Sequence, residues 1–295
     1  MGTVYNSERE IRHFLDLWNS KPKMVKKHTA DLWDERADVM EKELETDEDR
    51  KRRNDERVAS AAAFLREHGL LAANDQVIDI GCGPGRFVAE FAKTAGHVTG
   101  VDFSKKMTEY GAAYAASQGL SNTDFSVCDF KQADIEALGW KGKYDLVFSC
   151  TTPAIGNWEL LEKSMSMSRG WCFHGSFVDC YDGLIADIAE HVFHRPYKTR
   201  FTGWSSYALF NILWLKGYMP YISYFDEKSM DRYSASRYLA AEMVEEFGIY
   251  RDDEESVDKV YEYLKDKESS GALVYPYRCR YMWMLWNVND IVVRP

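Results

Sequence analysis

The segment that most constrains this chain is the stretch 77–85, which reads VIDIGCGPG. An apolar run is interrupted by one acid, and three glycines then follow at alternate positions before a helical pattern begins. A Cβ at Gly81 or Gly83 would block a ligand that must approach the main chain closely. The helix that follows would present free N–H groups to an anionic group such as a carboxylate. The segment therefore predicts a buried strand, a ligand-binding loop and a helix.

A second acid supports a nucleotide-type ligand. Residues 97–102 form another apolar segment, and it ends at Asp102, where a carboxylate can accept both hydroxyls of a ribose. Two ligands fit a glycine loop followed by such an acid, namely NAD and S-adenosylmethionine. The dinucleotide fingerprint requires a glycine at position 86, but Arg86 stands there, and Asp79 has no role in a dinucleotide site.

The glycine loop resembles the first motif of the class I S-adenosylmethionine-dependent methyltransferase family, acid-x-G-x-G-x-G. Asp79, Gly81, Gly83 and Gly85 match that motif position by position. The resemblance is to members that act on small molecules, and it covers about residues 55–180. Three further segments look like the family's second, third and fourth strands: 97–104 (HVTGVDFS), 128–130 (CDF) and 144–149 (YDLVFS).

The resemblance implies S-adenosylmethionine as the cofactor and S-adenosylhomocysteine as the product. It implies that Asp79 orients the loop and the methionyl amino group, that Asp102 binds the ribose, and that Asp129 accepts from the adenine amino group. Phe103, Met107 and Phe130 would pack against the adenine. The expected cofactor-binding residues are Trp33, Asp79, Gly81, Cys82, Gly83, Gly85, Asp102, Phe103, Met107, Asp129, Phe130 and Cys150.

Methyl transfer from a sulfonium depends mainly on holding the reacting atoms in line and close together. A general base is required only for an acceptor that arrives protonated, so no catalytic residue is assigned. His174 and Cys150 are the candidates, although a structural histidine and a thiol packed beside the cofactor are the preferred interpretations. No metal site is expected. Cys150, Cys172 and Cys180 could bind a metalloid such as arsenic only if their three thiolates lay within reach of one another, and nothing in their spacing indicates this.

Alternating strand and helix patterns predict an α/β fold with a Rossmann-like, doubly wound sheet. The resemblance implies seven strands, mostly parallel, with the last one antiparallel. We expect an N-terminal helical lid over residues 1–52, a cofactor-binding core over 53–180, and a region of helical inserts plus the last two strands over 181–295. The expected strands are 76–80, 97–102, 123–128, 144–149, 171–178, 218–225 and 278–286.

A run of mixed charge, residues 45–57, precedes the core. Such a run is typical of a solvated helix face on which opposite charges pair four residues apart. The stretch 33–37 (WDERA) lies just before it and looks like the W-D-x-R-A sequence found ahead of the core in some small-molecule members. We expect this region to close over the cofactor.

The amino-acid composition limits the classes of partner that we expect this chain to bind. The 295 residues carry a formal net charge of −10, and 45% of them are hydrophobic. Acidity disfavours nucleic acid and anionic membranes, and residues 149–153 (SCTTP) lack the Asn-Pro-Pro-Tyr motif of amino-group methyltransferases. These features predict a small-molecule acceptor, no nucleic-acid or membrane partner, and a monomer or homodimer.

The cysteines are scattered and the N-terminus has no apolar leader, which predicts a reduced, cytoplasmic protein. The acceptor is an O, N, S or C nucleophile that the sequence does not identify. Two alternatives stay open: a non-catalytic protein that binds S-adenosylmethionine and regulates, and an NAD-dependent oxidoreductase.

Overall fold

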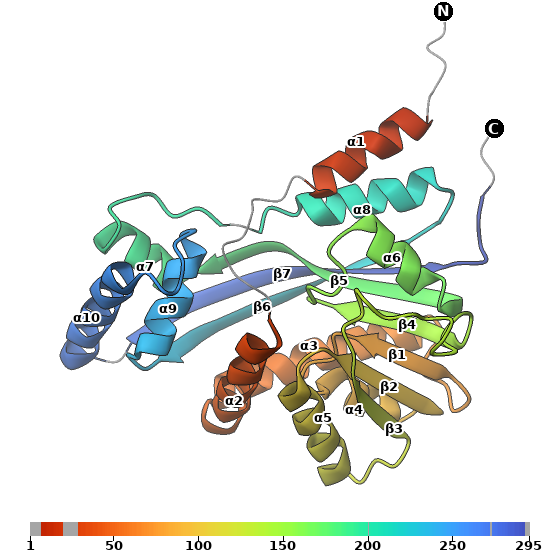
Figure 1. The fold of residues 1–295 in the computed structure, drawn as a ribbon, viewed down its shortest axis with the longest axis horizontal. Coiled ribbons are helices and arrows are strands. Elements are labelled where there is room, and N and C mark those ends of the chain that lie inside the picture. The colour runs from red at the N-terminus through yellow and green to blue at the C-terminus, as the bar shows by residue number, and fades with distance from the viewer. Residues whose placement is uncertain (1–6, 20–28, 200, 272, 293–295) are drawn as a thin grey trace, which may run out of the picture.

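The computed structural model describes residues 7–19, 29–199, 201–271 and 273–292. They build one sheet in the order β3-β2-β1-β4-β5-β7-β6 (Figure 1). Strands β1 to β5 pair in parallel, and β7 is antiparallel to both of its neighbours. The predicted doubly wound, seven-stranded sheet is confirmed. The strands are β1 (Gln76–Ile80), β2 (His97–Asp102), β3 (Thr123–Val127), β4 (Tyr144–Cys150), β5 (Ser168–Asp182), β6 (Tyr221–Tyr233) and β7 (Leu273–Asn287).

Helices cover both faces of this sheet, and Figure 1 shows α6 and α8 on the opposite side from α3, α4 and α5. Polar caps fix where several of them begin: Ser104 accepts from Met107 N at the start of α5, and Asn157 accepts from Leu160 N at the start of α6. The helices of the two layers are α3 (Glu48–Glu67), α4 (Arg86–Ala92) and α5 (Lys105–Ser117) on one face, and α1 (Ser7–Asn19), α6 (Trp158–Met165) and α8 (Trp204–Leu215) on the other.

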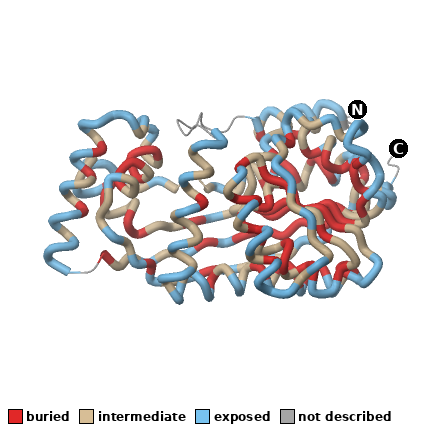
Figure 2. Tube along the Cα trace, turned by 60° about the horizontal axis from the view of Figure 1, so that its bottom comes forward, coloured by how far each residue is buried: buried red, intermediate tan, exposed pale blue. Residues whose placement is uncertain are grey.

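The core lies between these layers, where β1, β4 and β5 are buried on both faces (Figure 2). The Phe148 and Phe173 rings stack with centroids 4.5 Å apart, and Trp283 continues this aromatic row onto β7. Within the described part of the chain, no helix is long and apolar enough to cross a membrane.

The last three strands are longer than the sequence predicts. Strands β5, β6 and β7 run beyond the core and carry α7 (Gly183–His191), α9 (Arg237–Glu246) and α10 (Glu254–Ser270) on their far ends (Figure 1). We call this region, residues 179–199, 226–271 and 273–280, the arm. It has a small core of its own, made by Leu184, Ile188, Val244, Val260, Leu264 and Leu273.

Strand β6 is one of these longer strands: it continues to Tyr233, and α9 begins only at Arg237. The end of β6 is rich in charge, so local propensity disfavours a strand there. Pairing with β7 overrides that preference, since the register runs without a break from Tyr221 opposite Leu285 to Tyr233 opposite Leu273.

Helix α3 contains most of the mixed charge run, from residue 48 onward, and it has two different faces. On the outer face, Lys51 pairs with Asp55 and Arg52 with Glu56, as expected for a solvated helix. On the inner face, Arg53 is only 9% exposed and pairs with Glu227 at 3.3 Å and Asp231 at 3.1 Å, both on β6. The solvated interpretation is therefore wrong for this inner face, where buried ion pairs fasten α3 to the base of the arm.

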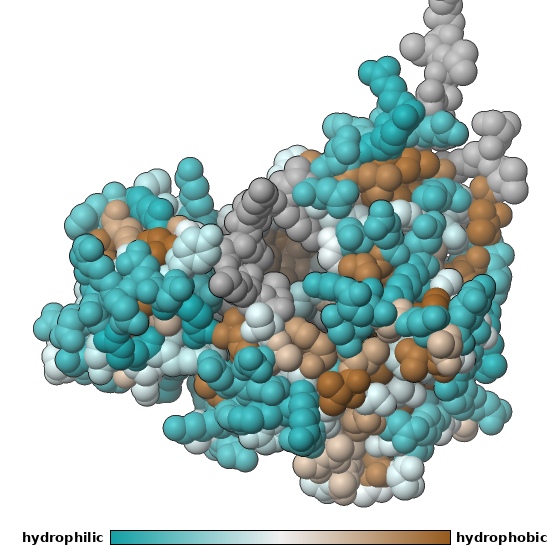
Figure 3. All heavy atoms as spheres, in the orientation of Figure 1, coloured by the Kyte–Doolittle hydropathy of each residue, from teal (hydrophilic) through white to brown (hydrophobic). Residues whose placement is uncertain are grey.

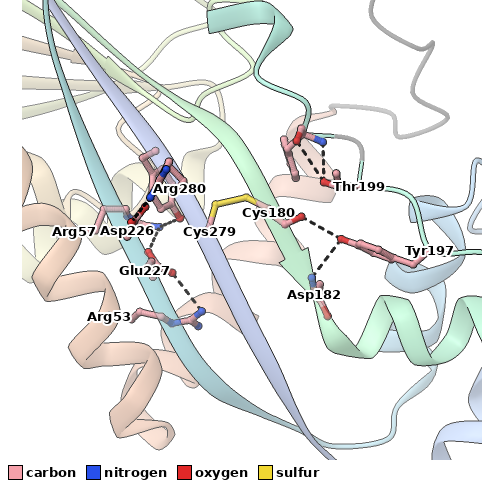
Figure 4. The surroundings of a disulfide bond; sticks show 12 residues. Arg53, Arg57, Cys180, Asp182, Tyr197, Thr199, Asp226, Glu227, Cys279 and Arg280 are labelled. Atoms are coloured by element: carbon pink, nitrogen blue, oxygen red, sulfur yellow. Dashed lines mark hydrogen bonds and ion pairs between the residues drawn. A yellow bond between two sulfur atoms is a disulfide. The ribbon is translucent and has the colours of Figure 1, made fainter.

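Cys180 on β5 and Cys279 on β7 form a disulfide at directly opposed positions of the antiparallel pair (Figure 4). The prediction of a fully reduced chain does not hold for this pair, because the sequence separation of 99 residues hides their proximity. Cys180 is thereby unavailable to the soft-metal grouping with Cys150 and Cys172.

The disulfide predicts the count of reactive thiols. The chain has six cysteines, and four of them are free in the structure. Alkylation in guanidinium without a reductant should therefore label four cysteines, and peptide mapping should find Cys180 and Cys279 linked. Labelling of all six under the same oxidising purification would contradict this pairing.

Candidate functional site

A cavity of about 200 Å³ lies where β1, β2 and β4 end, at the edge of the sheet that also carries the glycine loop. The carboxyl ends of parallel strands are the usual ligand-binding edge of a doubly wound sheet. The cavity brings together most of the residues that the sequence predicts for a cofactor site: Trp33, Gly81, Cys82, Gly83, Asp102, Phe103, Met107, Asp129, Phe130 and Cys150. Asp79 and Gly85 lie outside its lining.

The three glycines of the loop serve three different purposes. A Cβ on Gly83 would meet nothing nearer than the Met107 Sδ at 3.9 Å, so this position faces open space that a ligand can fill. A Cβ on Gly81 would lie 1.9 Å from Thr152 Oγ1, and one on Gly85 would lie 2.8 Å from Gly111 Cα. A Cβ would therefore point into open space at Gly83, whereas at Gly81, which also lines the cavity, it would collide with the loop after β4.

Asp79 is a buried carboxylate that lacks a full set of partners. It is 1% exposed, and its Oδ2 atom accepts no hydrogen bond. Burial, together with the neighbouring Asp102, raises the pKa of Asp79 well above its usual range. A cationic ligand group would remove this cost, so the methionyl ammonium of S-adenosylmethionine fits the site.

Asp102 joins the glycine loop to the end of β2. Its Oδ2 accepts from Gly83 N at 3.0 Å and its Oδ1 accepts from Ser104 N at 2.9 Å. These bonds fix the carboxylate at the cavity wall, and each oxygen retains a lone pair for a ribose hydroxyl. Burial raises the pKa of Asp102, although the backbone donors oppose that shift.

Three apolar side chains and one carboxylate lie together in the cavity lining. The apolar ones are Phe103, Met107 and Phe130, and the carboxylate is Asp129. Lys163 fixes the Phe130 segment, since its Nζ donates to Phe130 O at 2.7 Å. This arrangement fits a flat ring with an exocyclic amino group.

Helix α2 (Ala30–Thr46) closes one side of the cavity, and Trp33, Met40 and Leu44 face into it. Acidic side chains on α2 fasten it to the core: Asp38 accepts from Lys106 Nζ at 2.6 Å, and Glu41 accepts from Arg86 Nη2 at 2.8 Å. The helix therefore has the position that the predicted lid requires.

The two catalytic candidates lie in different surroundings. Cys150 lines the cavity, but burial raises the pKa of its thiol to about 12, so it is not a thiolate at neutral pH. His174 is not among the cavity-lining residues. Its Nδ1 lies 3.0 Å from Ser149 Oγ, and Ser149 belongs to the face of β4 opposite that of Cys150.

Some cavity-lining residues were not foreseen. Thr151 and Thr152 follow β4, and Thr151 has a left-handed backbone with φ of 49°. Asn54 and Arg57 come from α3, inside the charge run that looked solvated. Met40 and Leu44 recur at helical spacing with Trp33, and that apolar stripe was the one signal that could have found them.

The comparison with protein families matches residues 71–168 to a model described as a methyltransferase domain. Among curated proteins, the chain is similar to the 23S rRNA (uracil(1939)-C(5))-methyltransferases RlmD of Pseudomonas fluorescens and Shewanella amazonensis. Identity is 27% over 150 residues for the first (51% of this chain, 31% of that protein) and 35% over 145 residues for the second (49% and 31%). The chain thus spans less than a third of the length of these relatives.

Among solved structures, the chain is similar to the magnesium protoporphyrin IX methyltransferase of Synechocystis with bound S-adenosylhomocysteine. The TM-score is 0.44 and the sequence identity is 16%, and the alignment covers 80% of this chain and 85% of that one. A putative methyltransferase from Bacillus halodurans gives a TM-score of 0.47, 12% identity and coverage of 76% and 97%.

The prediction that nucleic acid is not a partner is wrong, because the curated relatives are named as rRNA methyltransferases. The net charge misled that inference because it averages over regions that differ in charge. Much of the acidity lies in the arm, which includes Glu242, Glu246, Asp252, Asp253, Glu254, Glu255 and Asp258.

The family match and the strand–loop–helix unit coincide in this chain. The matched segment contains β1, the glycine loop, Asp102 and β4, which are the elements that form the cavity. Residues 71–168 therefore match a methyltransferase domain, a kind of domain that uses S-adenosylmethionine as its cofactor.

Proposed function

We propose that this chain is an enzyme that transfers a methyl group from S-adenosylmethionine to a small-molecule nucleophile. The observation that carries the proposal is the cavity at the ends of β1, β2 and β4, in which Gly83 leaves open space beside the Asp102 carboxylate. In this proposal the sequence-predicted residues keep their roles toward methionyl, ribose and adenine groups. Location in the cytoplasm stays a prediction.

The bound cofactor supplies a methyl group already activated by its positive sulfur. The work left to the protein is to position the acceptor and to exclude water. Cys150, Thr151 and Thr152 line the cavity where β4 stops, and in this proposal they form the wall that an acceptor contacts. No residue has to act as a base if the acceptor arrives deprotonated.

One feature supports a small acceptor. The cavity lies beneath α2, whose Trp33, Met40 and Leu44 restrict the space above the glycine loop. The arm, by contrast, presents a mostly hydrophilic surface in Figure 3.

The second candidate function is methylation of RNA. It is favoured by the similarity to RlmD, which is 35% identical to this chain over 145 residues in the Shewanella amazonensis protein. That similarity spans about half of this chain, so the remaining half can serve another acceptor.

Cofactor binding gives the first test. Calorimetry with S-adenosylhomocysteine should show binding, and Asp102→Ala should weaken it by about 1–3 kcal/mol, because ribose hydrogen bonds to a charged group are lost. Asp124→Ala is the matched control, since this exposed carboxylate on β3 pairs with His97 outside the cavity. Absence of heat with the unmodified protein, or equal affinity for both variants, would contradict the proposal.

The raised pKa of Asp79 predicts a dependence of stability on pH. Its folded-state pKa lies above the unfolded value of about 3.9, so the contribution of Asp79 is most favourable below that pH and is lost as the pH rises through the folded-state pKa. In ligand-free protein, Asp79→Asn should remove this loss of stability at higher pH, because the amide does not titrate. Thermal melts from about pH 4 to pH 8 should show the unmodified protein losing stability relative to the variant, and parallel curves would refute the assignment.

The acceptor class can be measured directly. The protein is incubated with tritium-labelled S-adenosylmethionine and a cell extract that has been separated into an ultrafiltrate of metabolites and a purified RNA fraction. Label should enter the ultrafiltrate, and Asp102→Ala should reduce it. Incorporation into RNA alone would establish the second candidate function instead.

A further inference from the structure

Arg36 connects the cavity beside the glycine loop to the arm. It lies on α2 one turn after Trp33, and its guanidinium carbon is 5.3 Å from the centre of the Trp33 ring. The same guanidinium pairs with Glu242 on α9 of the arm, at a distance of 3.3 Å between Nη1 and Oε1. One side chain therefore contacts both a residue of the cavity wall and a helix of the arm.

The Trp33 ring borders the part of the cavity where the sequence predicts the adenosyl group. Trp33 and Phe103 both line the cavity, and their rings meet edge to face with centroids 6.4 Å apart. Phe103 directly follows Asp102, the expected ribose-binding acid. A rotation of the Trp33 ring would therefore change the space in which a ligand at Asp102 lies.

Glu242 restrains the group that is stacked on this ring. A cation is attracted to an indole only while it stays over the ring, and the Arg36 side chain is 34% exposed, so water competes for its guanidinium. Glu242 is less exposed, at 19%, and its Oε1 also accepts from the Tyr238 hydroxyl at 3.3 Å. The contacts form a chain that runs from Tyr238 through Glu242 and Arg36 to Trp33.

A second cavity, of about 640 Å³, lies between α2 and the arm on another side of α2. Lys42 and Glu43 of α2 line it, and so do Tyr238, Leu239 and Glu242 from the arm. The two helices thus enclose a space here instead of packing closely against each other. Side-chain bridges between them, such as the ion pair that Glu242 makes, therefore contribute to how α2 is placed over the first cavity.

We propose that Glu242 is a positioning residue for the cofactor, which acts through Arg36 to hold the Trp33 ring where it closes the first cavity over the adenosyl group. The inference rests on the proposed function and gives the arm a task in the reaction. Glu242 does not line the first cavity. A change at this arm residue is therefore transmitted to ligand affinity without any contact between its side chain and the ligand.

Fluorine NMR of protein labelled with 5-fluorotryptophan observes the Trp33 ring directly. The chain has nine tryptophans, and the Trp33 signal is the one that Trp33→Phe removes. In ligand-free protein, Glu242→Gln should shift or broaden that signal and leave the signal of Trp286, which is buried in the core, unchanged. Glu255→Gln is the matched control, because it removes an exposed arm carboxylate that pairs with Lys259 within α10.

Ligand affinity tests the consequence for the cofactor. Glu242→Gln should weaken S-adenosylhomocysteine binding about 2- to 5-fold in calorimetry, the range that a partly exposed ion pair supports. Arg36→Met should weaken it at least as much, and Glu242→Gln added to that variant should cause no further loss, because Glu242 acts through Arg36. Arg36→Lys keeps the charge beside Glu242 without the planar stack, so a smaller loss is expected, and it replaces Arg36→Met if that variant does not fold.

The outcomes separate this proposal from the proposed function. If the unmodified protein does not bind S-adenosylhomocysteine, the proposed function fails, and a positioning role toward the cofactor fails with it. If the protein binds this ligand but Glu242→Gln leaves the Trp33 signal and the affinity unchanged, the assignment of Glu242 is overturned while cofactor binding stands. Losses that add in the double variant would overturn the route through Arg36 in the same way.

Discussion

The structure depends on a carboxylate that is buried without a counter-charge. Asp79 is the penultimate residue of the central strand and is 1% exposed, and a second acid, Asp102, ends the neighbouring strand. Two carboxylates in a poorly solvated place are costly unless hydrogen bonds or a cation compensate. Backbone N–H groups compensate Asp102, whereas Asp79 Oδ2 has no donor. A cationic ligand explains why such an arrangement persists.

Elements distant in the sequence enclose this edge of the sheet. Helix α2 covers the cavity and is fastened to the core through Asp38 and Glu41. Helix α3 runs beneath the arm, where Arg53 and Arg57 contact Glu227 on β6. The arm is thereby connected, through one buried ion-pair cluster, to a side chain that lines the cavity.

Much of the fold could be predicted because the local signals agree with the tertiary structure. Apolar runs, alternate glycines and capping residues located β1, β2 and β4 and the helices between them. The ends of β6 and β7 could not be predicted in the same way, since charged residues such as Asp226 and Lys228 become strand residues only through pairing with β7. Cys180 and Cys279 likewise become neighbours only when β5 and β7 align.

The candidate site could be predicted where its residues form a contiguous sequence motif. It could not be predicted where folding brings together residues that are distant in the sequence. Asp102, Phe103 and Met107 follow one another along the chain, and the structure places them on one cavity. Arg57 sits among alternating charges, and nothing in its neighbours distinguishes it from the exposed Arg52. Only the packing of α3 against β6 decides which arginine faces inward.

The most direct test of the account is a crystal structure of the protein grown with S-adenosylhomocysteine. The account predicts density for the ligand between the glycine loop and α2, with its ammonium at Asp79 Oδ2 and its ribose at Asp102. A structure in which the loop over residues 79–85 is closed against Met107, with the ligand absent or bound elsewhere at saturating concentration, would contradict it.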